Sequence, residues 1–130
     1  MATATPLKVA VLGPAGQCGS CVVDELLSRG HTVVGISRNP PEDWKSNSGY
    51  SSVPVDIQDT KKLSKVFSAG FDAIVSAYAP PLADLSKVYE TGVEGHGKIK
   101  MALLESSHEG QIIVIGGAGS LHTKNGQQLV

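Results

Sequence analysis

The chain has 130 residues, enough for one domain with a sizeable core but short for a two-lobed enzyme. Hydrophobic residues make up 41%, charged residues 18%, and the formal net charge is −1, so no basic excess points to nucleic acid or to an anionic membrane. The apolar runs are too short to span a bilayer, the first residues lack a signal-peptide core, and the two cysteines cannot form a disulfide framework, so we expect one cytoplasmic domain over residues 1–130.

The first part of the chain predicts a strand, a helix and a second strand. Residues 7–12 (LKVAVL) form a short apolar run that stops at Gly13, which is typical of a buried strand. A helix is expected over residues 17–29, ended by Gly30, because apolar residues follow at helical spacing: Val22, Val23, Leu26 and Leu27. Residues 32–37 (TVVGIS) predict the second strand.

The middle of the chain is less regular. Residues 39–52 are rich in Pro, Ser, Gly and Asn, so we expect a loop there. Residues 53–55 predict a brief third strand, and Pro54 places it at an edge of the sheet, where a missing N–H is tolerated. A helix follows over residues 59–67, with three inward side chains: Leu63, Val66 and Phe67.

The last part predicts a strand over residues 72–77, a long helix over roughly 83–107 and a fifth strand over 112–115. The buried side of the long helix is expected to consist of Leu85, Val88, Tyr89, Val93, Ile99, Met101, Leu103 and Leu104. Because strands and helices alternate, the pattern predicts an α/β fold: a doubly wound, Rossmann-like parallel sheet of five strands in the order 3-2-1-4-5.

A glycine-rich loop lies between the first strand and the first helix. Gly13, Gly16 and Gly19 have the spacing G-x-x-G-x-x-G, which only partly meets the commoner G-x-G-x-x-G pattern. In a doubly wound sheet this turn binds a pyrophosphate, since glycine lets the backbone come close and the helix N-terminus offers free N–H groups. The alternative is a tight turn whose glycines serve only packing.

The same segment contains Cys18 and Cys21, which have the C-x-x-C spacing of a redox dithiol. A helix N-terminus favours a thiolate, so a redox role for Cys18 is physically reasonable. We favour the phosphate loop over the dithiol, because the turn that would present the cysteines already matches a phosphate cradle. We expect Cys21 to pack against the sheet as a small hydrophobe, and we expect no metal site.

The end of the second strand indicates which nucleotide the loop would bind. NAD-specific folds usually have Asp or Glu there, which holds the ribose 2′-hydroxyl and repels a 2′-phosphate. This chain has Ser37 and Arg38 instead, and arginine suits a phosphate. An ordinary surface arginine is the alternative. Asp56, just after the third strand, would contact the adenine edge or cap the following turn.

Five segments together resemble the atypical short-chain dehydrogenase/reductases, which bind NAD(P)H and include NmrA-like and flavin-reductase-like proteins. They are VAVLGPAGQCGS, VVGISRNP, VPVDIQD, DAIVSA and IIVIGGAGSL, and the resemblance covers about residues 7–121. It implies NADP(H) bound along one edge of the sheet. The implied cofactor-binding residues are Gly13, Gly16, Gln17, Cys18, Gly19, Ser37, Arg38, Asp56, Ile57, Ala77 and Tyr78, and Ser120 is the implied catalytic hydroxyl, with a turn or N-cap serine as the alternative.

Two departures from the family pattern matter. No Tyr-x-x-x-Lys occurs, because Tyr50, Tyr78 and Tyr89 lack a lysine four residues on, so the usual proton donor is missing. The chain also stops soon after the fifth strand, where relatives continue. That would leave apolar surface exposed, and we expect a homodimer or a partner chain to complete the site.

The sequence therefore predicts an NADP(H)-binding protein that acts as a small oxidoreductase on an organic, small-molecule acceptor. Two alternatives stay open. One is a non-catalytic NADP-binding module that regulates or scaffolds, and the other is a non-redox enzyme, such as an isomerase or cyclase, that reuses the pocket.

Overall fold

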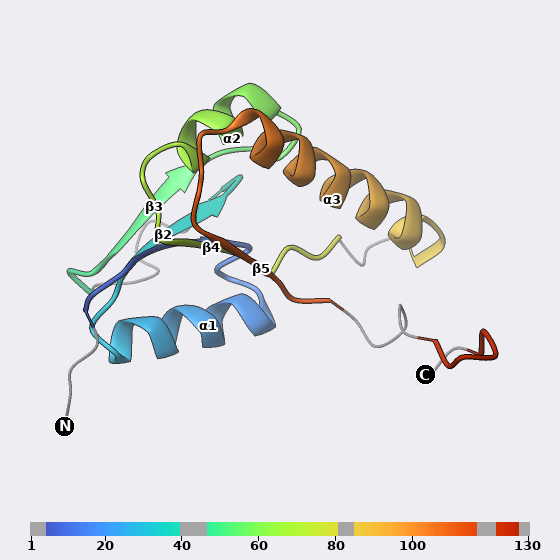
Figure 1. The fold of residues 1–130 in the computed structure, drawn as a ribbon, viewed down its shortest axis with the longest axis horizontal. Coiled ribbons are helices and arrows are strands. Elements are labelled where there is room, and N and C mark those ends of the chain that lie inside the picture. Colours follow the sequence, from blue (N-terminus) through green and yellow to red (C-terminus); the bar gives the residue numbers. More distant parts are fainter. Residues whose placement is uncertain (1–4, 40–46, 81–84, 117–121, 128–130) are drawn as a thin grey trace.

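In the computed structural model the chain forms one five-stranded sheet (Figure 1). The structure describes residues 5–39, 47–80, 85–116 and 122–127. All neighbouring strands are parallel, and their order is β3-β2-β1-β4-β5, which confirms the predicted doubly wound α/β sheet. The strands are β1 (Lys8–Leu12), β2 (Thr32–Ser37), β3 (Tyr50–Pro54), β4 (Ala73–Ser76) and β5 (Gln111–Val114).

Helices cover both faces of the sheet (Figure 1). On one face lies α1 (Gln17–Ser28); on the other lie α2 (Thr60–Phe67) and α3 (Val88–Glu105), which follows a 3₁₀ turn η1 (Leu85–Lys87). The apolar core accordingly has two parts. The first contains Val9, Val11, Val23, Val33 and Val75, and the second contains Ala10, Leu12, Ile36, Leu63, Phe67, Ile74 and Ile99. Successive residues of β1 thus pack on opposite faces, as the period of a strand requires.

Two helix boundaries follow from side-chain chemistry near the helix ends. Asp59 caps α2, because its carboxylate accepts a hydrogen bond of 3.1 Å from the Lys62 N–H. Gly30 follows α1 with φ +83°, a left-handed conformation that favours glycine. The helices predicted over residues 17–29 and 59–67 agree with these two boundaries to within one residue.

The third strand starts earlier than predicted. β3 begins at Tyr50, which pairs with Val33, so the end of the expected loop over residues 39–52 is strand. Ser51 and Ser52 are exposed at the edge of the sheet. The sequence did not predict them as strand, because two adjacent polar residues lack the apolar pattern of a buried strand. The edge position that Pro54 predicted is confirmed.

The predicted buried side of α3 is largely wrong. Ile99 is buried and Leu103 packs partly against the core, but four apolar side chains expected inside are exposed: Tyr89, Val93, Met101 and Leu104. The side chains of Leu85 and Val88 lie outside those that the structure describes. Small residues instead approach the core, because Gly95 and Ala102 are buried on the inner side of the helix.

β5 forms the other edge of the sheet and exposes apolar side chains. Ile112 and Ile113 are each 48% exposed and Val114 is 57% exposed. The expectation of apolar surface beside the fifth strand is therefore confirmed. Of the helices in the described part of the chain, none has the length and apolar character needed to cross a membrane.

Candidate functional site

The loop between β1 and α1 is held together by backbone contacts that require glycine. Gly13 has φ +71°, and its carbonyl oxygen accepts a hydrogen bond of 3.3 Å from the Gly16 N–H. A Cβ atom on Gly13 would lie 2.8 Å from the carbonyl oxygen of Ala77, and a Cβ atom on Gly19 would overlap the carbonyl oxygen of Gly13. The first turn of α1 therefore sits directly against the end of β1, as a phosphate-binding turn requires.

The start of α1 is suited to an anion. Gly16 occupies the N-cap position and has no side chain to accept the first helical N–H groups, and the first turn carries no acidic residue. Gln17 and Cys18, which begin the helix, are exposed. Free N–H groups and the positive end of the helix dipole together favour a bound phosphate.

Both cysteines of the loop segment are free thiols on the surface. Cys18 and Cys21 are exposed, so the prediction that Cys21 packs against the sheet is wrong. The reason is its place on the helix, since the buried residues of α1 are Gly19 and Val23 and Cys21 lies two residues from each, on the opposite side of the helix.

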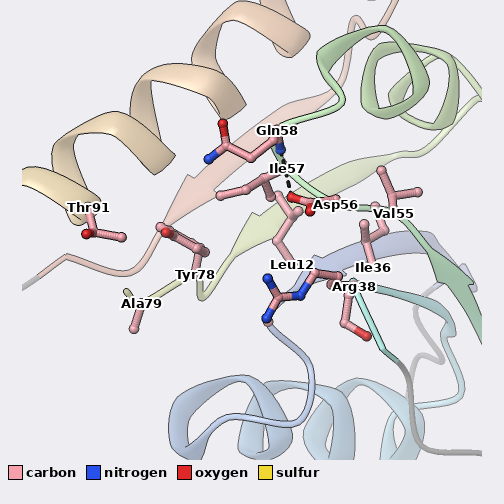
Figure 2. A pocket seen from close by; sticks show the side chains of 12 residues that line it. Leu12, Ile36, Arg38, Val55, Asp56, Ile57, Gln58, Tyr78, Ala79 and Thr91 are labelled. Atoms are coloured by element: carbon pink, nitrogen blue, oxygen red, sulfur yellow. Dashed lines mark hydrogen bonds between the residues drawn. The ribbon is translucent and has the colours of Figure 1, made fainter. Parts of the chain in front are cut away.

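A cavity of about 340 Å³ opens beside the loop, at the carboxyl ends of the strands (Figure 2). Parallel sheets of this topology bind ligands at this edge. Residues from the ends of β1, β2, β3 and β4 and from α3 line it: Leu12, Gly13, Ile36, Ser37, Arg38, Val55, Asp56, Ile57, Gln58, Tyr78, Ala79 and Thr91. Gly13 belongs to both the cavity and the loop, so the two form one continuous site.

Several polar groups in this cavity are available to a ligand. The Ser37 hydroxyl oxygen is buried and has no hydrogen-bond partner among the described residues. Arg38 forms no ion pair with another described residue, and its side chain reaches into the cavity from the end of β2 (Figure 2). Buried polar atoms are rarely left unpaired, so a ligand that supplies an acceptor near Ser37 fits the site.

Asp56 caps the turn that follows β3. Its Oδ1 atom accepts a hydrogen bond of 2.9 Å from the Gln58 N–H, the dashed contact in Figure 2. The turn-capping alternative for Asp56 is therefore correct as a structural role. The residue also lines the cavity, so both of its predicted roles are compatible.

Tyr78 forms a wall of the cavity and is positioned by α3. Its ring meets the ring of His96 edge-on, with centroids 5.3 Å apart and planes at 83°. A Cβ atom on Gly95 would overlap the outer atoms of the Tyr78 ring, so the tyrosine occupies space that only glycine leaves open. Burial raises the pKa of Tyr78, and the negative charges of Glu94 and Asp56 raise it further, so its hydroxyl stays protonated at neutral pH.

A family model described as NAD(P)H-binding matches residues 13–128. The chain belongs to this NAD(P)H-binding family. The match confirms the resemblance inferred from the sequence, and it covers the glycine loop, every cavity-lining residue except Leu12, and both edge strands of the sheet.

Three proteins that are similar to this chain are each longer than it. The Bacillus subtilis protein YwnB is 30% identical over 117 residues, which are 88% of this chain and 49% of YwnB. A proposed epimerase from Bacteroides thetaiotaomicron superposes with a TM-score of 0.79 at 25% identity, covering 96% of this chain and 54% of the other. A proposed NADH-flavin reductase from Streptococcus pneumoniae gives 0.64 at 25% identity, covering 92% and 52%. The chain thus spans about half the length of each.

The fold brings most of the residues that the sequence predicted to bind NAD(P)H to one place. Six of them line the cavity: Gly13, Ser37, Arg38, Asp56, Ile57 and Tyr78. Gly16, Gln17, Cys18 and Gly19 form the adjoining loop and helix start, and Ala77 lies behind Gly13. Ser120, the catalytic residue expected from the resemblance, lies outside the described residues.

The sequence reasoning missed half of the cavity lining. Leu12 and Val55 end predicted strands and Ile36 lies one residue before the end of another, so their position in the sequence could have identified them. Gln58, Ala79 and Thr91 carried no comparable signal. Thr91 in particular reaches the site only because α3 packs where it does.

Proposed function

We propose that the chain binds NADP(H) and acts as an oxidoreductase on a small organic acceptor. The observation that carries this proposal is the pair Ser37 and Arg38 at the end of β2, inside the cavity. NAD-specific sites have an acidic residue here, whereas a guanidinium offers a fork of donors to a 2′-phosphate. The unpaired Ser37 hydroxyl is a further donor for the same phosphate.

The described residues fit each part of such a dinucleotide. The pyrophosphate would bind the backbone of Gly13 to Gly19 at the start of α1, and the adenosine would lie in the cavity beside Asp56 and Ile57. Ala77 and Tyr78 would flank the nicotinamide ribose. The catalytic hydroxyl implied by the family resemblance, Ser120, lies outside the described residues. Bound NADPH supplies a hydride. We propose an acceptor of the flavin type, because one structural neighbour is a proposed NADH-flavin reductase and a flavin needs little acid assistance from the protein.

Removing the Arg38 guanidinium tests the cofactor preference. Calorimetric titration of the wild-type chain should give tighter binding of NADPH than of NADH. Arg38→Ala should weaken NADPH binding about tenfold or more, the value of a hydrogen bond to a charged group, and leave NADH binding nearly unchanged.

Arg29→Ala is the matched control for Arg38→Ala. Arg29 is an exposed arginine on α1 that pairs with Glu25 at 2.8 Å, outside the cavity, and an exposed pair of this kind contributes little. Equal NADPH affinities in the wild type and Arg38→Ala would refute the NADP assignment. Equal affinity of the wild type for the two cofactors would refute it too.

A second candidate function is supported by the proposed epimerase among the structural neighbours. In it the chain binds the dinucleotide as a regulatory module, or reuses the pocket for a non-redox reaction. Single-turnover oxidation of NADPH with a flavin acceptor distinguishes the candidates. The oxidoreductase should oxidise it, while a module should bind NADPH and NADP⁺ without turnover.

We further propose that the protein works in the cytoplasm, where free thiols such as Cys18 and Cys21 are kept reduced.

We also propose that a second copy of this chain covers β5. The support for the dimer is the row of half-exposed apolar residues on this edge strand: Ile112, Ile113 and Val114. An uncovered apolar edge promotes pairing with another chain. A dimer would also help to wall the nicotinamide side of the site.

A lysine at the edge of β5 tests this dimer. Sedimentation analysis should show a dimer for the wild type, and Ile113→Lys should raise its dissociation constant by about tenfold or more, because a charge blocks edge pairing. Ser51→Lys, on the opposite edge strand β3, is the control and should leave the dimer intact. A wild-type chain that stays monomeric at every concentration would exclude this assembly.

A further inference from the structure

Cys18 and Cys21 are an unused pair of nucleophiles beside the proposed phosphate site. Both lie in the first turns of α1, and both are free and exposed. Residues three apart on a helix are neighbours on its surface, with Cβ atoms about 5–6 Å apart. A disulfide needs Cβ atoms about 3.5–4.5 Å apart, so a movement of about 1–2 Å would let the two sulfur atoms bond.

The loop decides which residues make that movement. Gly19, between the two cysteines, is held against Gly13 by a backbone contact that leaves no room for a Cβ atom. The adjustment therefore falls on Gln17 and Cys18, which start the helix. Their N–H groups are the donors that the proposed function assigns to the pyrophosphate, so closing the disulfide disturbs the anion site.

We propose that Cys18 and Cys21 form a reversible dithiol–disulfide site whose oxidation weakens dinucleotide binding at the adjoining loop. The oxidant is a low-molecular-weight disulfide. One cysteine thiolate attacks it to give a mixed disulfide and releases one thiol; the second cysteine then attacks the protein-bound sulfur and releases the other. Two protein thiols are oxidised to one disulfide, and the oxidant is reduced to two thiols. The effect on binding rests on the proposed function, whereas formation of the disulfide does not.

The test treats the full chain with oxidised glutathione and then alkylates the remaining thiols. Intact-mass analysis should show the loss of two hydrogen atoms, no bound glutathione and no alkylated cysteine. NADPH affinity should fall by about tenfold, the loss expected for one hydrogen bond to a charged group, and dithiothreitol should restore it. Binding and oxidation are reciprocal at equilibrium, so saturating NADPH should raise, by the same factor of about ten, the ratio of oxidised to reduced glutathione needed for the disulfide to form.

Cys21→Ser is the control variant, because Cys21 is outside the proposed cofactor contacts. It should bind NADPH like the reduced wild type and hold glutathione on Cys18 as a stable adduct. Oxidised wild type that carries glutathione on both cysteines, or keeps both thiols, would overturn the dithiol site. If the disulfide forms and NADPH affinity is unchanged, the coupling is wrong. If the reduced protein binds no dinucleotide, both the proposed function and its coupling to oxidation are refuted. The intact-mass result still tests independently whether Cys18 and Cys21 form a disulfide.

Discussion

Gly19→Ala should abolish detectable dinucleotide binding and lower the free energy of unfolding by about 1–3 kcal/mol, the usual range for overpacking. The added Cβ atom would overlap the carbonyl oxygen of Gly13 and lie 3.1 Å from the Cα atom of Pro14. Both neighbours are backbone, so no flexible side chain can yield. The start of α1 must move away from β1, and its N–H groups then leave the anion site.

Urea unfolding and calorimetric titration with NADPH measure the two effects of Gly19→Ala. The matched control is Gly97→Ala on α3, where an added Cβ atom meets nothing within 4 Å. Alanine is favoured over glycine inside a helix by about 0.5–1 kcal/mol, so this control should be slightly more stable than the wild type and should bind NADPH equally well. Wild-type affinity in Gly19→Ala would mean that the loop does not bind the dinucleotide.

The parts of the fold that were predictable are those where one local pattern determines the outcome. β1 and β2 are covered on both faces, so each is a continuous apolar run that the sequence displays directly. Gly30 and Asp59 mark helix ends for local reasons. β3 was placed too late, because Ser51 and Ser52 pair with β2 only through tertiary contacts that the sequence does not encode locally.

The inner face of α3 shows why the rest of the site could not be predicted. Apolar residues occur all round this helix, so their spacing does not select one side: Ile99 is buried while Val93 is 58% exposed. Steric fit determines which side of α3 faces the core, because Gly95 leaves room for Tyr78 and Ala102 packs closely on the core. Thr91 joins the cavity as a consequence of that packing.

The close approach of Gly95 to Tyr78 leads to a further prediction: Gly95→Ala should weaken NADPH binding with little change in the free energy of unfolding. The added Cβ atom would overlap the outer part of the Tyr78 ring, including its hydroxyl oxygen, and a side chain can move where backbone cannot. Tyr78 should therefore swing away from His96 and change the shape of the cavity it lines. We expect NADPH affinity to fall by about tenfold, while the free energy of unfolding changes by less than about 1 kcal/mol.

Gly97→Ala again provides the control for Gly95→Ala, because both substitutions add the same methyl group to the same helix and only Gly95 faces Tyr78. Calorimetric titration should show wild-type affinity for Gly97→Ala and weakened binding for Gly95→Ala. The double variant Gly95→Ala, Tyr78→Ala removes the overlap, so Gly95→Ala should cost much less affinity in that background than in the wild type. Equal costs in the two backgrounds would show that Tyr78 does not transmit the effect, and the cavity wall would then be set by another part of α3.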